Sequence, residues 1–130
     1  MPKQLLATID IPGGLPKCGS PNARCHWRQR HSQFKTARET AYFATVSHLV
    51  NHPLPPIPET TGLAISWRIG LPRGANRRDL DNVIGSAKPI LDGIQDAIGM
   101  DDSRFAEVAV DQYRSQSGEW EVSATLYAIT

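Results

Sequence analysis

The chain has 130 residues, of which 40% are hydrophobic and 21% are charged, and its formal net charge is +1. This length fits one domain, residues 1–130, with a modest core of its own, and the composition excludes a disordered or a membrane-spanning class. No apolar run approaches the roughly 18 residues of a spanning helix, and the N-terminal apolar stretch is too short for a signal peptide, so we expect a cytoplasmic protein with no membrane partner.

The small net charge hides a division along the chain. Residues 1–78 hold eleven Lys and Arg against three Asp and Glu, whereas residues 79–130 hold three against ten, so the halves carry +8 and −7. The segment from Lys17 through Arg38 contains six basic residues and no acid. Such a division suits a protein that binds a polyanion next to a metal site. It suits equally well two oppositely charged halves that pair with each other in the fold.

The first half of the chain predicts a strand, a loop and a helix. Residues 5–11, LLATIDI, are β-prone, and the glycines and proline after them end the strand. Residues 12–31 form a basic loop. From Ser32, the predicted N-cap, to Pro53, which ends the pattern, apolar or small residues recur at helical spacing: Phe34, Ala37, Ala41, Thr45 and Leu49.

The second half predicts a strand, a helix and a hairpin. A proline-rich connector, residues 51–60, leads into GLAISWRIGL, residues 62–71, which alternates like a strand. A helix follows between Asp79 and Gly99. Residues 105–113 and 119–129 both alternate and are separated by the turn signal SQSG, which predicts a β-hairpin. The order β-α-β-α-β-β predicts an α/β (α+β) domain, a small mixed β-sheet with two main helices.

Acidic residues are concentrated in the second helix and just after it. The stretch RRDLDNVIGSAKPILDGIQDAIGMDDSRF, residues 77–105, contains six aspartates, of which Asp96 is expected to face solvent. An N-cap role and the helix macrodipole account for Asp79 and Asp81 but not for the rest. Around the helix, Asp81, Lys88 and Asp92 lie within about 40° of each other, opposite the apolar stripe. Pro89 is expected to kink the helix or to start it afresh.

These carboxylates either form a solvated acidic face or share a cation. Three or four carboxylates in one groove repel one another unless a hard cation lies among them, and oxygen ligands favour Mg²⁺ or Mn²⁺. Such a site beside a basic surface provides the groups that phosphodiester hydrolysis needs. The metal activates water and offsets charge on the phosphate, and a lysine stabilises the transition state or the leaving oxygen.

The order RRDLDN, a lysine, LDGI and MDDSRF resembles the RusA family of Holliday-junction resolvases, whose motif is D-x-D-N, then K-x-x-x-D, then a D-D pair. The resemblance covers Arg77 to Phe105, extends more weakly over the preceding strand, and is seen again in SPNARCHWR, residues 20–28. It implies a small, homodimeric, metal-dependent endodeoxyribonuclease, of a kind common in phages and prophages. Such an enzyme resolves four-way DNA by paired cuts in DNA recombination and repair.

The resemblance also assigns residues. Asp79, Asp81 and Asp102 match the catalytic acids that bind the metal, and Lys88 matches the essential lysine. Supporting motif positions are Asn82, Asp92 and Asp101. The family usually has two residues between the Asn and the Lys, whereas VIGSA places five there, so Lys88 lies about 4.5 Å farther along a straight helix. A kink at Pro89, or a bulge through Gly85 and Ser86, would restore the distance.

The basic first half supplies the expected DNA contacts: Arg24, Arg28, Arg30, Lys35, Arg73, Arg77 and Arg78. His26 and His31 are expected to contact phosphate, and Trp27 to anchor the basic loop to the core rather than to stack on a base. Cys18 and Cys25 are expected to be reduced thiols. A zinc site that combines them with His48 and His52 is not favoured, because the cysteine spacing is unusual for zinc.

Two other functions remain open from the sequence. One is a branched-DNA-binding module that has kept the fold and lost cleavage because Lys88 is displaced. The other is a metal-dependent nuclease that acts on flaps or RNA.

Overall fold

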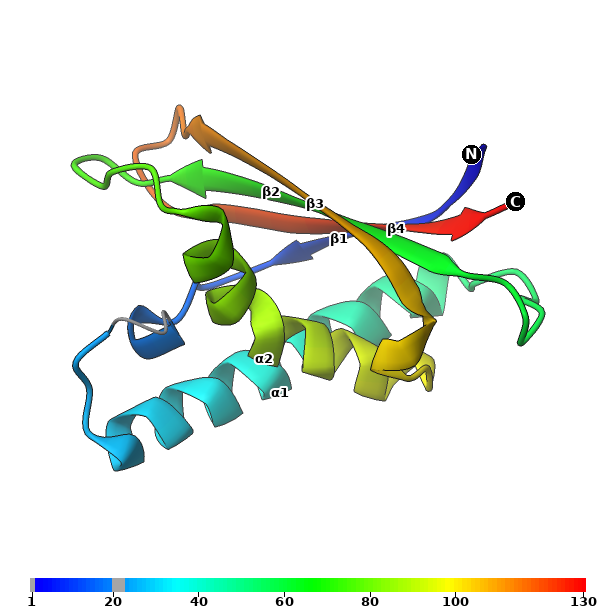
Figure 1. The fold of residues 1–130 in the computed structure, drawn as a ribbon, viewed down its shortest axis with the longest axis horizontal. Helices are drawn as coiled ribbons and strands as arrows, with labels where there is room; N and C mark the ends of the chain where they lie inside the picture. The colour runs from blue at the N-terminus through cyan, green and yellow to red at the C-terminus, as the bar shows by residue number, and fades with distance from the viewer. Residues whose placement is uncertain (1, 20–22) are drawn as a thin grey trace.

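The computed structural model describes residues 2–19 and 23–130. Four strands form one mixed sheet in the order β1-β4-β2-β3 (Figure 1). In chain order the elements are β1 (Lys3–Ile11), η1 (Lys17–Gly19), α1 (Trp27–Asn51), β2 (Leu63–Leu71), α2 (Leu80–Ile98), η2 (Asp102–Arg104), β3 (Phe105–Arg114) and β4 (Glu121–Ile129). The predicted order β-α-β-α-β-β and the mixed α+β fold are confirmed. The segment SPNARCHWR is described only from Ala23, because residues 20–22 lie outside the described part of the chain.

The predicted hairpin between the last two strands is wrong. β3 pairs in parallel with β2, and β4 pairs antiparallel with β2 on its other side and with β1. The loop after β3 therefore passes across the end of β2, where Ser115 N donates to Leu71 O at 3.1 Å and Arg73 N donates to Gly118 O at 2.9 Å. β2 is buried along most of its length, so it takes a neighbour on both edges.

The core lies between the sheet and the two helices, which cover the same face (Figure 1). Alternate strand residues such as Ile9, Trp67 and Leu126 point toward the helices and are at most 2% exposed. The apolar stripe of α2 meets them through fully buried side chains: Val83, Ala87, Ile90 and Ile94. The outward side of α2 carries Asp81, Lys88 and Asp92, together with the exposed side chains of Leu80 and Ile84.

The two helices approach closely through small residues. A Cβ atom added at Gly93 of α2 would overlap the Arg38 carbonyl oxygen and lie 2.9 Å from Ala41 Cβ. One turn farther along α1, Thr45 is fully buried, and its Oγ1 donates to Ala41 O at 2.7 Å. The close approach of α1 and α2 at Gly93 fixes the position of α2 over the sheet. It therefore also fixes the acidic residues at the two ends of α2.

Helix α1 starts earlier than predicted, at Trp27 rather than after Ser32. His26 occupies the N-cap position, and its Nδ1 accepts a hydrogen bond from Arg28 N at 3.2 Å. Histidine is not among the common N-cap residues, so the sequence pattern gave no sign of this start. Residues 27–31 of the predicted basic loop are therefore the first turns of the helix.

Cys18 and Cys25 form a disulfide, so the prediction of reduced thiols is wrong. The short η1 turn buries Cys18 completely, and Cys18 N donates to Gln33 Oε1 of α1 at 2.8 Å. The Cα atoms of Cys18 and Cys25 lie 5.8 Å apart, a separation that a disulfide spans. The disulfide leaves neither sulfur as a free thiolate for zinc.

Helix α2 runs without a break from Leu80 to Ile98, through Pro89, so the expected restart does not occur. It ends at Gly99, the predicted C-cap, whose φ of 71° lies in the left-handed region. Within the described part of the chain, none of the helices combines the length and the apolar character needed to cross a membrane.

Candidate functional site

The loop after β2 delivers Asp79 to the start of α2, as predicted. Asp79 has extended backbone angles, φ −62° and ψ 151°, and its carbonyl accepts from Val83 N at 3.1 Å. Its carboxylate makes no capping hydrogen bond among the described residues. Asp79 is the N-cap by position, but its side chain is exposed and available for another partner.

Strand β3 fixes this loop. The side-chain amide of Gln112 makes two hydrogen bonds to the backbone of Arg78. Its Oε1 accepts from Arg78 N at 3.0 Å, and its Nε2 donates to Arg78 O at 2.7 Å. Arg114 donates to the carbonyls of Pro72 and Ala75 at 2.6 and 2.7 Å. These bonds hold the segment that presents Asp79, and sequence reasoning missed both residues because they read as ordinary strand positions.

Lys88, halfway along α2, is the centre of a cluster of charged side chains that also contains Asp92 and Asp102. Its Nζ lies 2.8 Å from Asp92 Oδ1, one turn farther along the helix, and 2.5 Å from Asp102 Oδ2 in η2. Burial opposes the charged ammonium, but the hydrogen bonds to Asp102 and Asp92 outweigh it, and the pKa of Lys88 is raised. The same ammonium lowers the pKa of Asp102. Lys88 and Asp102 therefore stay charged across the neutral range.

Gln95 belongs to this cluster and was not predicted from the sequence. It is 8% exposed, and its Nε2 has no partner with hydrogen-bond geometry within the described chain. The amide nevertheless contributes, after Lys88, to the lowered pKa of Asp102, so it is a polar neighbour of that carboxylate. The signal that would have found it is its spacing: Gln95 follows Lys88 by seven residues, two helical turns along the same side.

The structure separates the two parts of the motif. Asp79 and Asp81 follow the end of β2, whereas Asp102 precedes β3, and β3 runs parallel to β2 with Leu63 beside Phe105. Asp102 therefore lies near the start of β2, with α2 spanning the distance between. Lys88 comes seven positions after Asp81, or about 10 Å along the helix.

The extra residues of VIGSA are part of regular helix, because α2 is α-helical throughout Leu80–Ile98. A bulge at Gly85 and Ser86 that would shorten the distance is not formed. Over the described ranges, no group of three or more Asp, Glu, His or Cys side chains is arranged to hold a metal. The metal site of Asp79, Asp81 and Asp102 stays a prediction.

The other predicted site residues take several positions. Asp101 is the N-cap of η2, and Asn82 is half-buried in the first turn of α2. Asp96, expected to face solvent, is exposed, and it also forms a two-bond contact with Arg38 of α1 at 2.6 and 2.9 Å. This contact ties α2 to α1 rather than serving the site.

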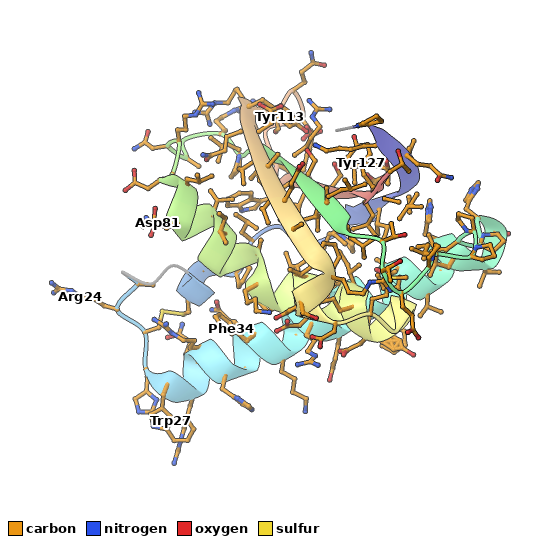
Figure 2. The ribbon with its side chains drawn as sticks, turned by 45° about the vertical axis from the view of Figure 1, so that its right-hand side comes forward. Arg24, Trp27, Phe34, Asp81, Tyr113 and Tyr127 are labelled. Carbon is orange, nitrogen blue, oxygen red and sulfur yellow. A yellow bond between two sulfur atoms is a disulfide. The ribbon has the colours of Figure 1, made fainter. Side chains whose placement is uncertain are left out.

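The predicted DNA-binding residues form two groups. Arg24, Arg28 and Lys35 are exposed at the start of α1, where Arg30 is half-buried and donates to Ala23 O at 3.0 Å, which braces the loop. In Figure 2 Arg24 and Asp81 point outward on the same side of the molecule.

The second group, Arg73, Arg77 and Arg78, lies in the loop before α2. Arg78 places its guanidinium 5.3 Å from the ring centre of Trp120, and Arg77 donates to Gln112 O at 3.3 Å. Arg73 and Arg77 are exposed, and they stand directly before the exposed Asp79 and Asp81. The structure thus places cations at the end of α2 that carries the D-x-D-N motif.

Trp27 does not anchor the loop to the core, so that prediction is wrong. Its side chain is 67% exposed at the first position of α1, and it points away from the body of the molecule (Figure 2). Because the helix begins at Trp27, the indole projects from the helix start instead of folding back under a loop.

Comparison with known proteins leaves the family open. No model of a known protein family matches the chain. The chain is similar to an uncharacterized protein of Xylella fastidiosa (strain Temecula1 / ATCC 700964), with 36% identity over 86 residues. The match covers 66% of this chain and 54% of that protein, so the chain spans about half the length of the relative.

Proposed function

We propose that the chain is a RusA-like, metal-dependent and structure-selective endodeoxyribonuclease that resolves four-way DNA junctions. The observation that carries this proposal is the contact between Lys88 and Asp102, 2.5 Å apart, which joins the K-x-x-x-D element to the D-D pair in space. Asp81 lies on the same side of α2 as Lys88, near the start of the helix, which directly follows the loop that contains Arg73, Arg77 and Arg78. The mixed fold and its exposed cations fit a DNA substrate.

The proposed reaction assigns a different role to each group of residues. Asp79, Asp81 and Asp102 would hold Mg²⁺ or Mn²⁺, because exposed carboxylates are the ligands these cations prefer. The cation would supply an activated water and offset charge on the phosphate. Lys88 offers its ammonium to the leaving oxygen or the transition state, and Gln112 keeps the Asp79 segment in place. Convergence of the three acids requires a movement at one end of α2 when metal and DNA bind.

Paired cuts require two active sites, so the proposal includes a homodimer that acts on branched DNA in the cytoplasm. Size-exclusion chromatography with light scattering measures the dimer directly. A monomer at micromolar concentration, both free and with junction DNA, would contradict this part of the proposal.

A branched-DNA-binding module without cleavage is the second candidate. The observation that favours it is the distance of about 10 Å along α2 between Asp81 and Lys88. In this case the cations still hold DNA, but the acids and the lysine never act on one phosphate.

The test is cleavage of an end-labelled four-way junction in Mg²⁺ or Mn²⁺, with flap, linear duplex and RNA substrates in parallel. We expect paired cuts in the junction and none in EDTA. Binding in both metals without cutting would favour the second candidate, and faster cutting of flaps or RNA would reassign the substrate.

The first prediction concerns matched Asp→Asn variants. Asp79→Asn, Asp81→Asn and Asp102→Asn should each abolish cutting while junction binding persists, because each removes a ligand charge at nearly constant size. Asp96→Asn is the control, since Asp96 is engaged by Arg38, and it should cut like the parent. Normal cutting by any of the first three would remove that residue from the site.

A further inference from the structure

We infer that Trp27 and the cations around it form a stacking platform for an unpaired base of a nucleic-acid strand. The side chain of Trp27 is 67% exposed, the largest aromatic surface that the start of α1 presents. An exposed indole is unfavourable in water, and it is common where a protein meets a flat apolar partner.

The immediate neighbours of Trp27 favour a base as that partner. The Arg28 guanidinium lies 5.3 Å from the centre of the indole ring, and the His26 ring lies 5.7 Å away at an angle of 30°. Arginine and histidine planes stack on bases as well as on indoles. His26 is also fixed in place, because its Nδ1 caps the helix at Arg28 N.

The charge around Trp27 specifies an anionic strand. Trp27, Arg28, His31 and Lys35 lie within about 100° of one another around α1, and all four are exposed. Arg24 precedes them in the loop, and the sequence has no acid between Lys17 and Arg38. The first turn of α1 likewise has no acidic residue, so its N-terminal dipole adds to the positive field.

An unpaired base fits this surface better than a duplex does. Bases in a duplex stack on each other and expose only their edges, whereas unpaired bases at a branch point, gap or single strand offer a free face. Cations then follow the phosphates on either side of the stacked base. The inference rests on the proposed function for nucleic acid as the partner, but it does not require cleavage.

Phe43 provides a matched control for Trp27. It is 69% exposed on the same helix, sixteen residues or about 24 Å farther along. Its ring stacks on Tyr42, with centres 5.3 Å apart, and Arg38 beside it is engaged by Asp96. Phe43 is therefore as exposed as Trp27 and has Lys35 nearby, but in the described part of the chain no arginine guanidinium or histidine ring lies against it.

The experiment measures fluorescence anisotropy in EDTA with a labelled 20-nucleotide oligo(dT) and a 20-base-pair duplex. Trp27→Ala should weaken oligo(dT) binding by about 5- to 100-fold and duplex binding by less than about twofold, since stacking on one base is lost. Trp27→Phe should recover most of the loss, and Phe43→Ala should bind like the parent. Both positions are exposed, so thermal melts should show intact folds.

Salt dependence separates stacking from charge. Trp27→Ala should leave the slope of log K against log salt unchanged, whereas Arg28→Ala should flatten it. Equal losses by Trp27→Ala on oligo(dT) and duplex, or no loss on either, would overturn the inference while leaving the nuclease proposal in place. If the parent protein binds neither DNA, the stacking platform fails, and cleavage of the four-way junction still tests the nuclease proposal separately. Trp27-dependent binding without any cleavage would support the stacking platform alone.

Discussion

At the scale of single residues, Lys88 connects the acids of α2 to those after it. Its ammonium contacts both Asp92 and Asp102, so the three groups carry a net charge of −1. The Lys88 side chain is about half-exposed, at 46%, so its contact with Asp102 contributes little to stability. The contact matters because it holds the ammonium next to the carboxylate. Because Lys88 stays exposed to solvent, its ammonium can leave Asp102 for another anion, such as a phosphate, without a change in burial.

The role of Lys88 can be read from kinetics. Lys88→Ala should lower turnover by at least about 100-fold and change junction affinity by less than about threefold, because a transition-state contact affects rate and a ground-state contact affects binding. Single-turnover cleavage and filter binding measure the two quantities. Equal losses would assign Lys88 to DNA positioning, and an unchanged rate would make Arg77 or Arg78 the next candidate.

At the scale of elements, the sequence predicts most of the fold but not its pairing. Periodicity located four strands and two helices, because each has one face against a common core. It did not show that β4 crosses to the far side of β2, since β3 and β4 alternate alike and a short turn between them resembles a hairpin. The crossing depends on contacts between distant segments, such as Ser115 N with Leu71 O, which no local pattern records.

The geometry of the candidate site could be predicted only in part, and its function stays a prediction. The acids and Lys88 stand out by composition and motif, and the structure joins Lys88 to Asp92 and Asp102. It does not join them to Asp81, because local pattern could not decide whether VIGSA forms a bulge or an extra turn. Gln112 was missed because its role arises from Arg78, which is distant in sequence, whereas Gln95 was missed although it follows Lys88 by two helical turns.

The approach of α1 to α2 gives a stability prediction. Gly93→Ala should destabilise the protein by about 1–3 kcal/mol, because the new methyl group overlaps the Arg38 carbonyl and crowds Ala41, which outweighs the higher helix propensity of alanine. Urea unfolding followed by circular dichroism measures the difference. Ala97→Gly in the same helix, at a half-buried position, serves as the propensity control. An unchanged or raised stability of Gly93→Ala would show that the helices lie farther apart.

The disulfide gives a second prediction at this scale. It closes a loop with a sequence separation of only 7, so its loss should cost about 2 kcal/mol in the chain-entropy account. Thermal melts of the parent with and without reductant, and of Cys18→Ser/Cys25→Ser, measure this cost. The double variant should be insensitive to reductant. Two free thiols in protein purified under air without reductant would contradict the disulfide.

At the scale of the whole molecule, the two charged halves pair only in part. Among the described residues, three ion pairs join them: Lys3 with Glu107, Arg38 with Asp96, and Arg68 with Asp111. In the part of the chain that the structure describes, no ion pair involves the following six basic residues: Arg24, Arg28, Lys35, Arg73, Arg77 and Arg78. The internal pairing that the charge pattern equally allowed therefore neutralises other cations and leaves these six without an ion pair among the described residues.

This distribution predicts how junction binding depends on salt. In Ca²⁺, chosen to occupy the acids without rapid cutting, affinity should fall steeply with salt, because each neutralised phosphate adds about −0.9 to the slope of log K against log salt on duplex arms. Arg24→Ala, Arg28→Ala or Lys35→Ala should each flatten the slope by up to about one unit, and a dimer would double the effect.

The structure supplies the control that makes this slope interpretable. Arg104 and Arg114 lie in the acidic half, but both donate to backbone carbonyls, so their loss would disturb loops as well as charge. Arg38→Ala removes the same charge from α1 at a side chain already neutralised by Asp96, and it should leave the slope unchanged. If Arg38→Ala flattens the slope as much as Arg28→Ala does, binding responds to total charge rather than to a defined surface. The nuclease proposal would then depend on the aspartate motif and Lys88 alone.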